Sequence, residues 1–216
     1  MNSELVEYTI ISPNTYGPRD VKKIDRITIH CVVGQCSASW LGEYFFNPGL
    51  KASSNYGIGS DGAVGLYVLE ENAAQTSSSK ANDMRAITIE CASDSYEPYK
   101  FNECVYKSLI DLCVDICKRH GKDKVIWLND KENTENYTPK PNEMVLTVHR
   151  WYTNRTCPGE WMYSRLGEFA DTVTEKLNKK PLYRVQVGAF HKWTNAQKYV
   201  ERLKRDGYDA FVTVNK

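Results

Sequence analysis

The sequence predicts an α/β protein, in which strands and helices alternate along the chain and pack in layers. Two observations predict this class. Apolar residues recur at every second position in some segments, as in strands, and at every third or fourth position in the segments between them, as in helices. The composition, with 41% hydrophobic and 25% charged residues, is that of a globular protein with a buried core.

Four strands are expected in the first part of the chain, at residues 26–32, 63–69, 86–92 and 144–149. In the first of them, Ile27 and Ile29 face one side and His30 faces the other. The third repeats this pattern with Glu90 in the position of His30. We therefore expect these two strands to be neighbours that point His30 and Glu90 at one surface. The fourth strand ends on His149.

Three helices are expected between and after these strands. Ser37 is the expected N-cap of the first, which the turn at residues 47–49 ends. The second begins near Asn102 and ends at Gly121. The third follows from apolar residues spaced by threes and fours over residues 162–177. The alternation of these helices with the strands supports the layered α/β class.

A polar stretch ending in a proline marks the clearest domain boundary. We expect one domain over residues 1–178, a linker over 179–181 and a small unit over 182–216. At roughly 150 residues per domain, the length of 216 residues leaves room for only a small second unit.

Charge and composition argue against several function classes. A net charge of +1 lacks the basic excess of a nucleic-acid binder and gives no bulk attraction to anionic membranes. No apolar stretch approaches the ~20 residues that a membrane-spanning helix needs, so no membrane insertion is expected. Glu4 and Glu7 precede the first basic residue, Arg19, which is unlike a secretory signal. With an odd number of scattered cysteines, this predicts a protein made in a reducing cytoplasm with free thiols.

Two of the four histidines and one cysteine form a candidate metal-ligand set. His30 lies on the polar side of its strand, His149 ends another strand, and Cys157 opens a Cys-Pro-Gly turn. Two imidazoles and one thiolate are a ligand set of an open zinc site, with a fourth position left for water. The spacing alone is a weak indication, because a lone histidine is more often structural or exposed.

Glu90 adds to this indication. A carboxylate in the middle of an apolar strand is costly to bury unless it has a partner or a role. Beside a metal site, it is the general base expected for hydrolysis. The alternative is a glutamate at a strand edge, paired with a surface Lys or Arg.

Two other arrangements of these residue types stay open. Cys113, Cys117 and His120 share one helix face and could bind a metal, although the cysteines also continue an apolar stripe and His120 suits the helix end. In the other, Cys157 is a nucleophile with His149 as its base, as in cysteine peptidases. Such nucleophiles usually lie at a helix N-terminus, and this arrangement leaves the first histidine without a role.

Taken together, five segments resemble the zinc-dependent N-acetylmuramoyl-L-alanine amidases, the family shared by phage endolysins, bacterial autolysins and peptidoglycan recognition proteins. The segments are His30, residues 52–58 with Asp61 and Gly62, residues 87–90, residues 147–149, and residues 157–159. They lie in the order of the family within residues 20–178, and the chain looks most like amidases from clostridial bacteria and their prophages. The resemblance implies a central mixed sheet flanked by helices, the amidase type 2 fold.

The resemblance also assigns roles by position. The family's zinc ligands match His30, His149 and Cys157. Glu90 matches the acidic residue that activates water, and Arg155 stands where many members carry a Lys that stabilises the developing oxyanion. Asn55 and Tyr56 are the implied substrate-binding residues. Some phage members use a tyrosine where this chain has Ser54, so no catalytic tyrosine is assigned.

The function implied by the resemblance is zinc-dependent hydrolysis of the bond between N-acetylmuramic acid and L-alanine in bacterial peptidoglycan. The protein would act at the cell wall as an endolysin or autolysin, released by a holin or by lysis. The alternative is a non-catalytic peptidoglycan-binding protein on the same fold. Members that only bind typically lack the cysteine ligand, so Cys157 favours the enzyme.

The small unit is predicted to be a strand, a helix and a second strand. The strands are expected over residues 183–190 and 209–214, with a helix that Thr194 or Asn195 caps and Gly207 ends. A βαβ unit of this size is below the ~40 residues at which lone domains usually need outside support.

The opening of this unit resembles a SPOR repeat, a module that binds peptidoglycan glycan strands stripped of peptide. The resemblance implies glycan contacts by Tyr183, Gln186 and Phe190, although ordinary strand packing is an equal alternative for them. Because only the first half of the module is matched, pairing of two copies into a homodimer is a further hypothesis.

Overall fold

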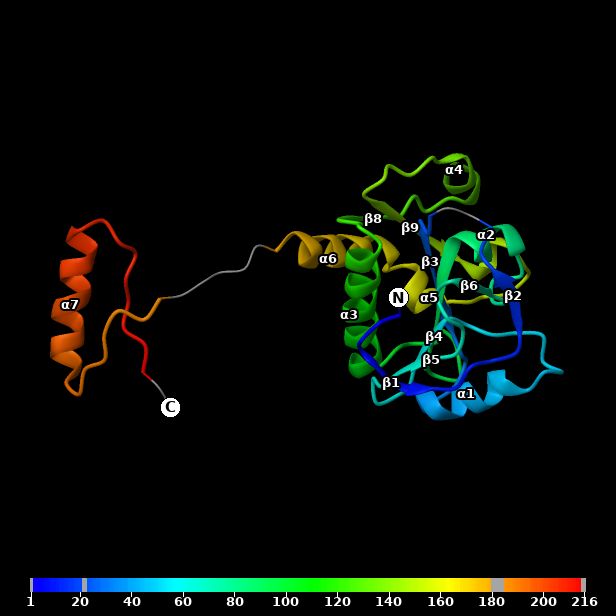
Figure 1. Ribbon diagram of the computed structural model, residues 1–216, viewed down its shortest axis with the longest axis horizontal. Coiled ribbons are helices and arrows are strands. Elements are labelled where there is room, and N and C mark those ends of the chain that lie inside the picture. The colour runs from blue at the N-terminus through cyan, green and yellow to red at the C-terminus, as the bar shows by residue number, and fades with distance from the viewer. Residues whose placement is uncertain (1, 21–22, 180–184, 215–216) are drawn as a thin grey trace. The chain divides into compact units, whose positions relative to one another are not determined.

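The structure is a computed structural model that describes residues 2–20, 23–179 and 185–214. The chain divides into two compact units, residues 1–179 and 180–216. The elements of the first unit are, in chain order, β1 (Val6–Thr9), β2 (Thr15–Pro18), β3 (Arg26–Cys31), α1 (Ala38–Phe46), β4 (Tyr56–Ile58), β5 (Val64–Leu66), β6 (Asn72–Ala74), α2 (Lys80–Arg85), β7 (Ala86–Cys91), α3 (Glu103–Arg119), β8 (Lys124–Ile126), α4 (Lys131–Asn136), β9 (Glu143–Val148), the 3₁₀ turn η1 (His149–Trp151), α5 (Glu160–Tyr163) and α6 (Leu166–Asn178) (Figure 1). The second unit contains α7 (Trp193–Arg205).

A mixed sheet forms the centre of the first unit. Its strand order is β1-β5-β4-β7-β3-β9-β8. All neighbouring pairs are parallel except β4 with β5, which is antiparallel. Strands β2 and β6 form a separate antiparallel pair. The expected α/β class with a central mixed sheet is thereby confirmed.

The two faces of this sheet differ in character. On one face, Ile27 and Ile29 of β3 belong to a core that also contains the buried stripes of α3 and α6. On the other face, Thr28 accepts a hydrogen bond from Asn82 of α2. The alternation of apolar and polar residues along β3 thus sends apolar side chains to the core and His30 to the polar face.

The long elements lie where the sequence predicts them. Strands β3, β7 and β9 confirm three of the four expected strands within one residue at each end, and β5 is a shorter form of the fourth. The helix caps are also confirmed, because the side chain of Ser37 accepts the Trp40 N–H and that of Asn102 accepts the Val105 N–H. The short strands β1, β2, β4, β6 and β8 and the short helices α2 and α4 were not predicted.

The third expected helix is interrupted and forms α5 and α6. The Ser164 N–H bonds the carbonyls of both Glu160 and Met162, and its hydroxyl also bonds the Glu160 carbonyl. The hydroxyl and the N–H of Ser164 thus compete for the Glu160 carbonyl, and the regular helical hydrogen bonds of α5 end after one turn. Helix α6 begins at Leu166.

The second unit only partly matches its prediction. Helix α7 confirms the expected helix, which ends before Gly207 in the left-handed conformation at φ +88°. Its N-cap is Lys192, so the expected cap at Thr194 or Asn195 is wrong, because both residues lie inside the first turn of the helix. Residues 185–190 and 209–214 form no strand, so the expected βαβ arrangement is wrong for the described residues. A strand pattern without a hydrogen-bonded neighbour does not make a sheet, and the described part of this unit offers no such neighbour. Tyr183, one of the first two residues of the segment 183–190, lies outside the described residues, as does its neighbour Arg184.

In the part of the chain that the structure describes, no helix has both the length and the apolar character needed to cross a bilayer.

Candidate active site

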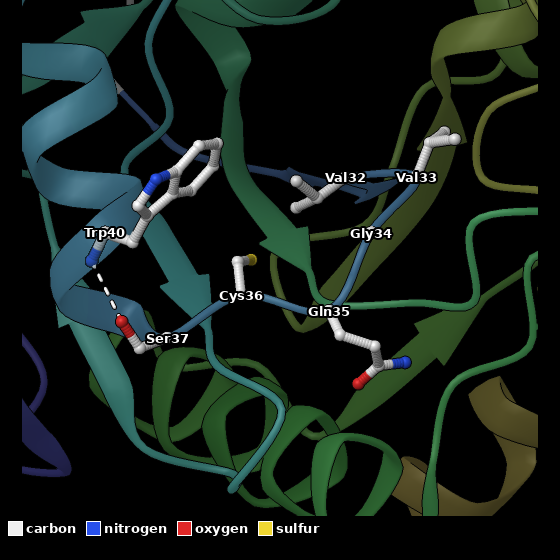
Figure 2. A pocket seen from close by; sticks show the side chains of 7 residues that line it. All are labelled: Val32, Val33, Gly34, Gln35, Cys36, Ser37 and Trp40. Atoms are coloured by element: carbon white, nitrogen blue, oxygen red, sulfur yellow. Dashed lines mark hydrogen bonds between the residues drawn. The ribbon is translucent and has the colours of Figure 1, made fainter.

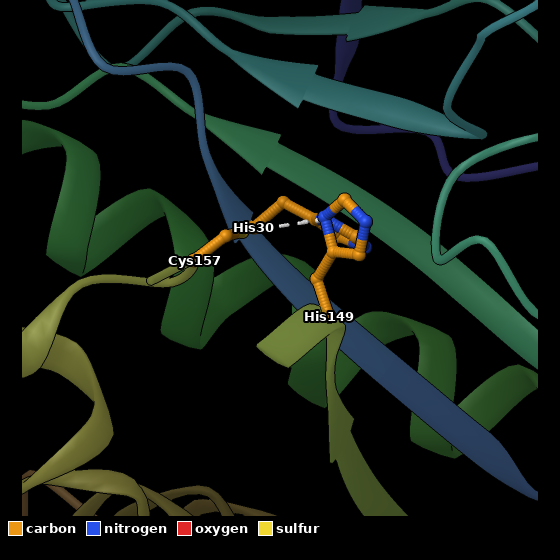
Figure 3. A group of neighbouring side chains, drawn as sticks. All are labelled: His30, His149 and Cys157. Carbon is orange, nitrogen blue, oxygen red and sulfur yellow. Dashed lines mark hydrogen bonds between the residues drawn. The ribbon is translucent and has the colours of Figure 1, made fainter. Parts of the chain in front are cut away.

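Three side chains that are far apart in the sequence meet at one end of the central strands. The candidate ligand atoms of His30, His149 and Cys157 all lie within 4.8 Å of one another (Figure 3). Sγ of Cys157 is 3.5 Å from Nδ1 of His30, and the two imidazole rings have centroids 5.0 Å apart. The structure therefore brings together all three residues that the sequence predicts as metal ligands.

Strand register places the two histidines. β3 and β9 are parallel neighbours, and Val148 of β9 stands opposite Ile29 of β3. His149, the next residue, begins η1 and so lies beside His30. Because parallel strands end at the same edge of a sheet, residues that close these two strands share one site.

The turn after η1 places the cysteine. The carbonyl of Cys157 accepts the N–H of Arg150, and its Sγ lies 3.4 Å from the N–H of Cys31. Gly159 has φ +84°, and a Cβ there would stand 2.7 Å from the Pro98 carbonyl oxygen. Only glycine fits this position, which holds the cysteine against the end of β3.

Glu90 lies directly beside this group. β7 and β3 are parallel, with Glu90 opposite His30, and Oε1 of Glu90 is 3.8 Å from Nδ1 of His30. The neighbour relation expected for these two strands is confirmed. Oε2 of Glu90 has no hydrogen-bond partner among the described residues. The alternative of a strand-edge glutamate is wrong, because β7 lies between β4 and β3 in the sheet.

Burial sets the protonation of these groups. It lowers the pKa of His30 well below the usual value, and the neighbouring His149 lowers it further. Burial and the charge of Arg155 lower the pKa of His149. Burial alone raises the pKa of Glu90 to about 7, and burial is also the main reason that the pKa of the Cys157 thiol is raised. At neutral pH both imidazoles are therefore neutral, which is the form that binds metals.

The chemistry of the donor set fits a zinc ion, and so does one of its interatomic distances. Zinc bonds of about 2.0–2.3 Å in a tetrahedral arrangement hold two ligand atoms roughly 3.3–3.6 Å apart. The 3.5 Å between Cys157 Sγ and His30 Nδ1 lies in this range. Two imidazoles and a thiolate are also the nitrogen and sulfur donors that zinc prefers, and three ligands leave a coordination position open.

Arg155 lies near the site on an exposed turn. Its charge contributes to the lowered pKa of His149, so this cation is near enough to act on the ring. An exposed cation beside a buried ligand set is positioned to meet negative charge on a bound substrate.

Asn55 and Tyr56 are not at the surface. Both are fully buried. The amide of Asn55 donates to the carbonyls of Val68 and Asn72 and accepts the N–H of Thr88. The hydroxyl of Tyr56 donates to a carboxylate oxygen in the core. Since their polar groups are used within the protein, the structure corrects the substrate-binding role implied for both: they hold the fold.

The second candidate metal group is a structural cluster. Cys113 and Cys117 are buried in the core between α3 and the sheet, and His120 forms the C-cap of α3. Nε2 of His120 lies 2.8 Å from Oε2 of Glu70. Within the described residues, His30, His149 and Cys157 are the only group of three or more such side chains close enough to hold one metal ion.

A cavity beside the site was not predicted. It has a volume of about 350 Å³ and is lined by the segment Val32–Ser37, which directly follows β3, and by Trp40 of α1 (Figure 2). Burial and the charge of the Glu90 carboxylate raise the pKa of Cys36, one of the lining residues, to about 11. Only the position of this loop in the sequence could have predicted the cavity. The loop directly follows the strand that carries His30, so it lies at the same edge of the sheet as the candidate ligands.

The family comparison agrees with this geometry. The family model described as N-acetylmuramoyl-L-alanine amidase matches residues 20–160, which include all three candidate ligands. The chain belongs to this amidase family. A second family model, described as the SPOR domain, matches residues 160–214. No curated protein matches the chain.

Solved structures share the fold of this amidase. A structure of PlyL is 14% identical with a TM-score of 0.53, over 77% of this chain and 95% of that one. A selenomethionine derivative of AmpD is 16% identical with a TM-score of 0.52, over 79% and 99%. Peptidoglycan recognition protein SD from drosophila is 18% identical with a TM-score of 0.51, over 74% and 88%. At these identities the likeness establishes the fold.

Proposed function

We propose that the protein is a zinc hydrolase that cleaves the amide bond between N-acetylmuramic acid and L-alanine in bacterial peptidoglycan. Membership of the amidase family supports the substrate class. The single observation that carries the proposal is the meeting of His30, His149 and Cys157 beside the buried carboxylate of Glu90.

In this proposal, His30, His149 and Cys157 hold the metal. When bound, zinc supplies Lewis-acid polarisation of the scissile carbonyl and acidifies water. Glu90 takes a proton from the attacking water and delivers it to the leaving amine of L-alanine, so that one carboxyl group serves as base and then as acid. Arg155 stabilises the negative charge that develops on the carbonyl oxygen. The cavity lined by Val32–Ser37 gives room for the part of the substrate next to the scissile bond.

The cysteine-peptidase alternative has less support. Cys157 makes its side-chain contact with His30 and not with the proposed base His149. Burial raises the pKa of the thiol, whereas a nucleophilic cysteine needs a lowered one.

The deciding experiment is digestion of purified peptidoglycan with and without a zinc chelator, followed by mass spectrometry of the products. Free stem peptides that begin at L-alanine, lost on chelation and restored by zinc, are the expected result. Intact peptidoglycan that still captures the protein would instead make it a binding protein. Cleavage within the stem peptide that survives chelation would point to Cys157 as a nucleophile.

We further propose that the second unit binds glycan strands, and that the protein acts at the bacterial cell wall after release by a holin or by lysis. The SPOR match to residues 160–214 supports the glycan role. Phe190 is 45% exposed and Gln186 is also exposed, so both side chains are accessible. Reduced sedimentation of Phe190→Ala with peptide-free glycan, against an unchanged Glu71→Gln control, is the expected result.

The homodimer stays a prediction, which a monomeric mass in light scattering at micromolar concentration would contradict.

A further inference from the structure

Ser78 contacts the metal-ligand set from outside it. Its hydroxyl, in the loop between β6 and α2, lies 3.2 Å from Nε2 of His149. A histidine binds a metal through one ring nitrogen, and the partner of its other nitrogen fixes the orientation and the tautomer of the ring. Nothing in the sequence pattern marks Ser78, which stands in a run of serines.

The choice of nitrogen follows from the geometry of the site. His30 presents Nδ1 to Cys157, at 3.5 Å from Sγ. In His149, the hydroxyl of Ser78 occupies Nε2. Nδ1 is then the nitrogen of His149 available to a metal, the same ring position that His30 presents to Cys157.

The backbone of Ser78 is held in an unfavourable conformation. Its φ is +64°, in the left-handed region that non-glycine residues rarely adopt. The carboxylate of Asp83 accepts the N–H groups of Thr76 and Ser77 at 3.0 and 3.1 Å. On the other side, the hydroxyl of Ser79 accepts the N–H of Asn82 and caps α2. Such strain persists only where the surrounding structure determines the conformation, and here it aims the hydroxyl at His149.

The loop is also tied to the strands that carry the ligands. The amide of Asn82 donates to the hydroxyls of Ser77 at 3.2 Å and of Thr28 at 2.9 Å. Thr28 in turn shares a hydrogen bond of 2.7 Å with Thr147. Because Thr28 lies on β3 and Thr147 on β9, this buried chain of polar groups fixes the distance between the Ser78 loop and both histidines.

We propose that Ser78 is a positioning residue for His149. Its hydroxyl accepts the proton of Nε2, which leaves the lone pair of Nδ1 directed at the metal. This inference rests on the proposed function, since it takes His149 to be a zinc ligand.

The test is zinc affinity, measured by competition with a chromophoric chelator on the full chain. Ser78→Gly removes the hydroxyl and permits the left-handed backbone, and we expect about 10–100-fold weaker zinc binding. Ser78→Asn restores an acceptor oxygen and also tolerates this conformation, so it should recover most of the affinity. Lys51→Gly is the control, because Lys51 is an exposed residue with φ +54° and its replacement relieves the same backbone strain.

The spectrum of the Co²⁺-substituted protein gives a second readout. Ser78→Gly should shift its visible bands, whereas Lys51→Gly should not, since the bands report ligand geometry. Zinc affinity within about twofold of wild type in Ser78→Gly would overturn the inference, as would equal weakening in Ser78→Gly and Ser78→Asn. If the wild type and His149→Ala bind zinc equally, the proposed ligand set fails, and the two failures are thereby distinguished.

Discussion

Glu90 occupies a position that costs the fold stability and that suits its proposed role in the reaction. It stands one residue before the end of strand β7, partly buried, with one carboxylate oxygen that has no hydrogen-bond partner among the described residues. A carboxylate without partners in the core costs stability, and such positions are typical of functional groups.

We therefore expect Glu90→Gln to lose activity while it keeps the metal. The amide has nearly the same shape but cannot take a proton from water, so the turnover number should fall by at least ~100-fold. Zinc stoichiometry and affinity should stay near the wild-type values. Turnover is measured as stem peptide released from peptidoglycan, with the exposed Glu71→Gln as the control. A near wild-type rate in Glu90→Gln would remove Glu90 from the mechanism.

Arg155 allows a second test at this scale. Its exposed guanidinium is close enough to His149 to lower the pKa of that ring. Arg155→Ala should reduce the turnover number by about 10²–10³-fold, the usual effect of removing an oxyanion donor, with little change in KM. Arg155→Lys should retain most of the activity, because a charged donor remains. Unchanged turnover in Arg155→Ala, like that expected of Arg202→Ala in α7, would exclude the oxyanion role.

At the scale of elements, the turn that carries Cys157 is the most constrained part of the site. We expect Gly159→Ala to destabilise the protein and weaken zinc binding, because the new Cβ would meet the Pro98 carbonyl at 2.7 Å. Left-handed strain alone costs of order 1–3 kcal/mol in a non-glycine residue. Gly121→Ala is the matched control, since Gly121 has φ +66° but nothing within 4 Å of its Cβ position.

Urea unfolding and zinc competition measure both effects. Gly121→Ala should lose only the strain energy and keep its zinc affinity, whereas Gly159→Ala should lose more stability and also bind zinc more weakly. Equal losses of stability with equal zinc affinity would show that close packing of this turn against Pro98 does not position Cys157.

The elements that the sequence predicts well are those with long patterns. Strands β3 and β7 repeat the same alternation, so their pairing and the meeting of His30 with Glu90 could be predicted. The three-residue strands β4, β6 and β8 are too short to show a period. Their existence depends on hydrogen bonds to neighbours that the sequence does not identify.

The residues that were misjudged or missed depend on tertiary contacts. Asn55 and Tyr56 lie in a polar motif typical of a surface loop, but the fold buries both, because their polar groups find partners on other segments. Ser78 reaches His149 across 71 positions of sequence, a contact that no local pattern can indicate. The three candidate metal ligands could be named from the sequence because metal chemistry limits the residue types, and the fold brings them together.

At the scale of the whole first unit, the two faces of the sheet have different roles: one forms the hydrophobic core and the other carries the candidate site. Its apolar face packs against α3 and α6, and its polar face carries the ligand set and the network behind it. Glu70, in the loop after β5, is a charged residue whose side chain is only 2% exposed. Arg119 and His120 at the end of α3 and Tyr56 of β4 all hydrogen-bond its carboxylate.

This buried carboxylate predicts how the stability of the protein depends on pH. Burial by itself raises the pKa of Glu70, but hydrogen bonds from His120, Arg119 and Tyr56 outweigh it and lower the pKa to about 2. The folded state therefore binds this proton less readily than the unfolded chain, where the usual value is 4.5. The ionised carboxylate contributes about 3 kcal/mol to the free energy of unfolding above pH ~4.5, and this contribution is lost as the pH falls towards 2.

Replacement of Glu70 by Gln tests this linkage. The variant should be less stable than the wild type at pH 7 by about the same 3 kcal/mol, and its stability should fall less between pH 4.5 and 2. Urea unfolding at a series of pH values measures both effects, with the exposed neighbour Glu71→Gln as the control that keeps the wild-type slope. Parallel slopes for Glu70→Gln and wild type would mean that other carboxylates govern acid unfolding. The predicted difference in slope would instead show that the ionised carboxylate of Glu70 stabilises the contact between α3, β4 and the loop after β5. This contact lies on the face of the sheet opposite the candidate metal ligands.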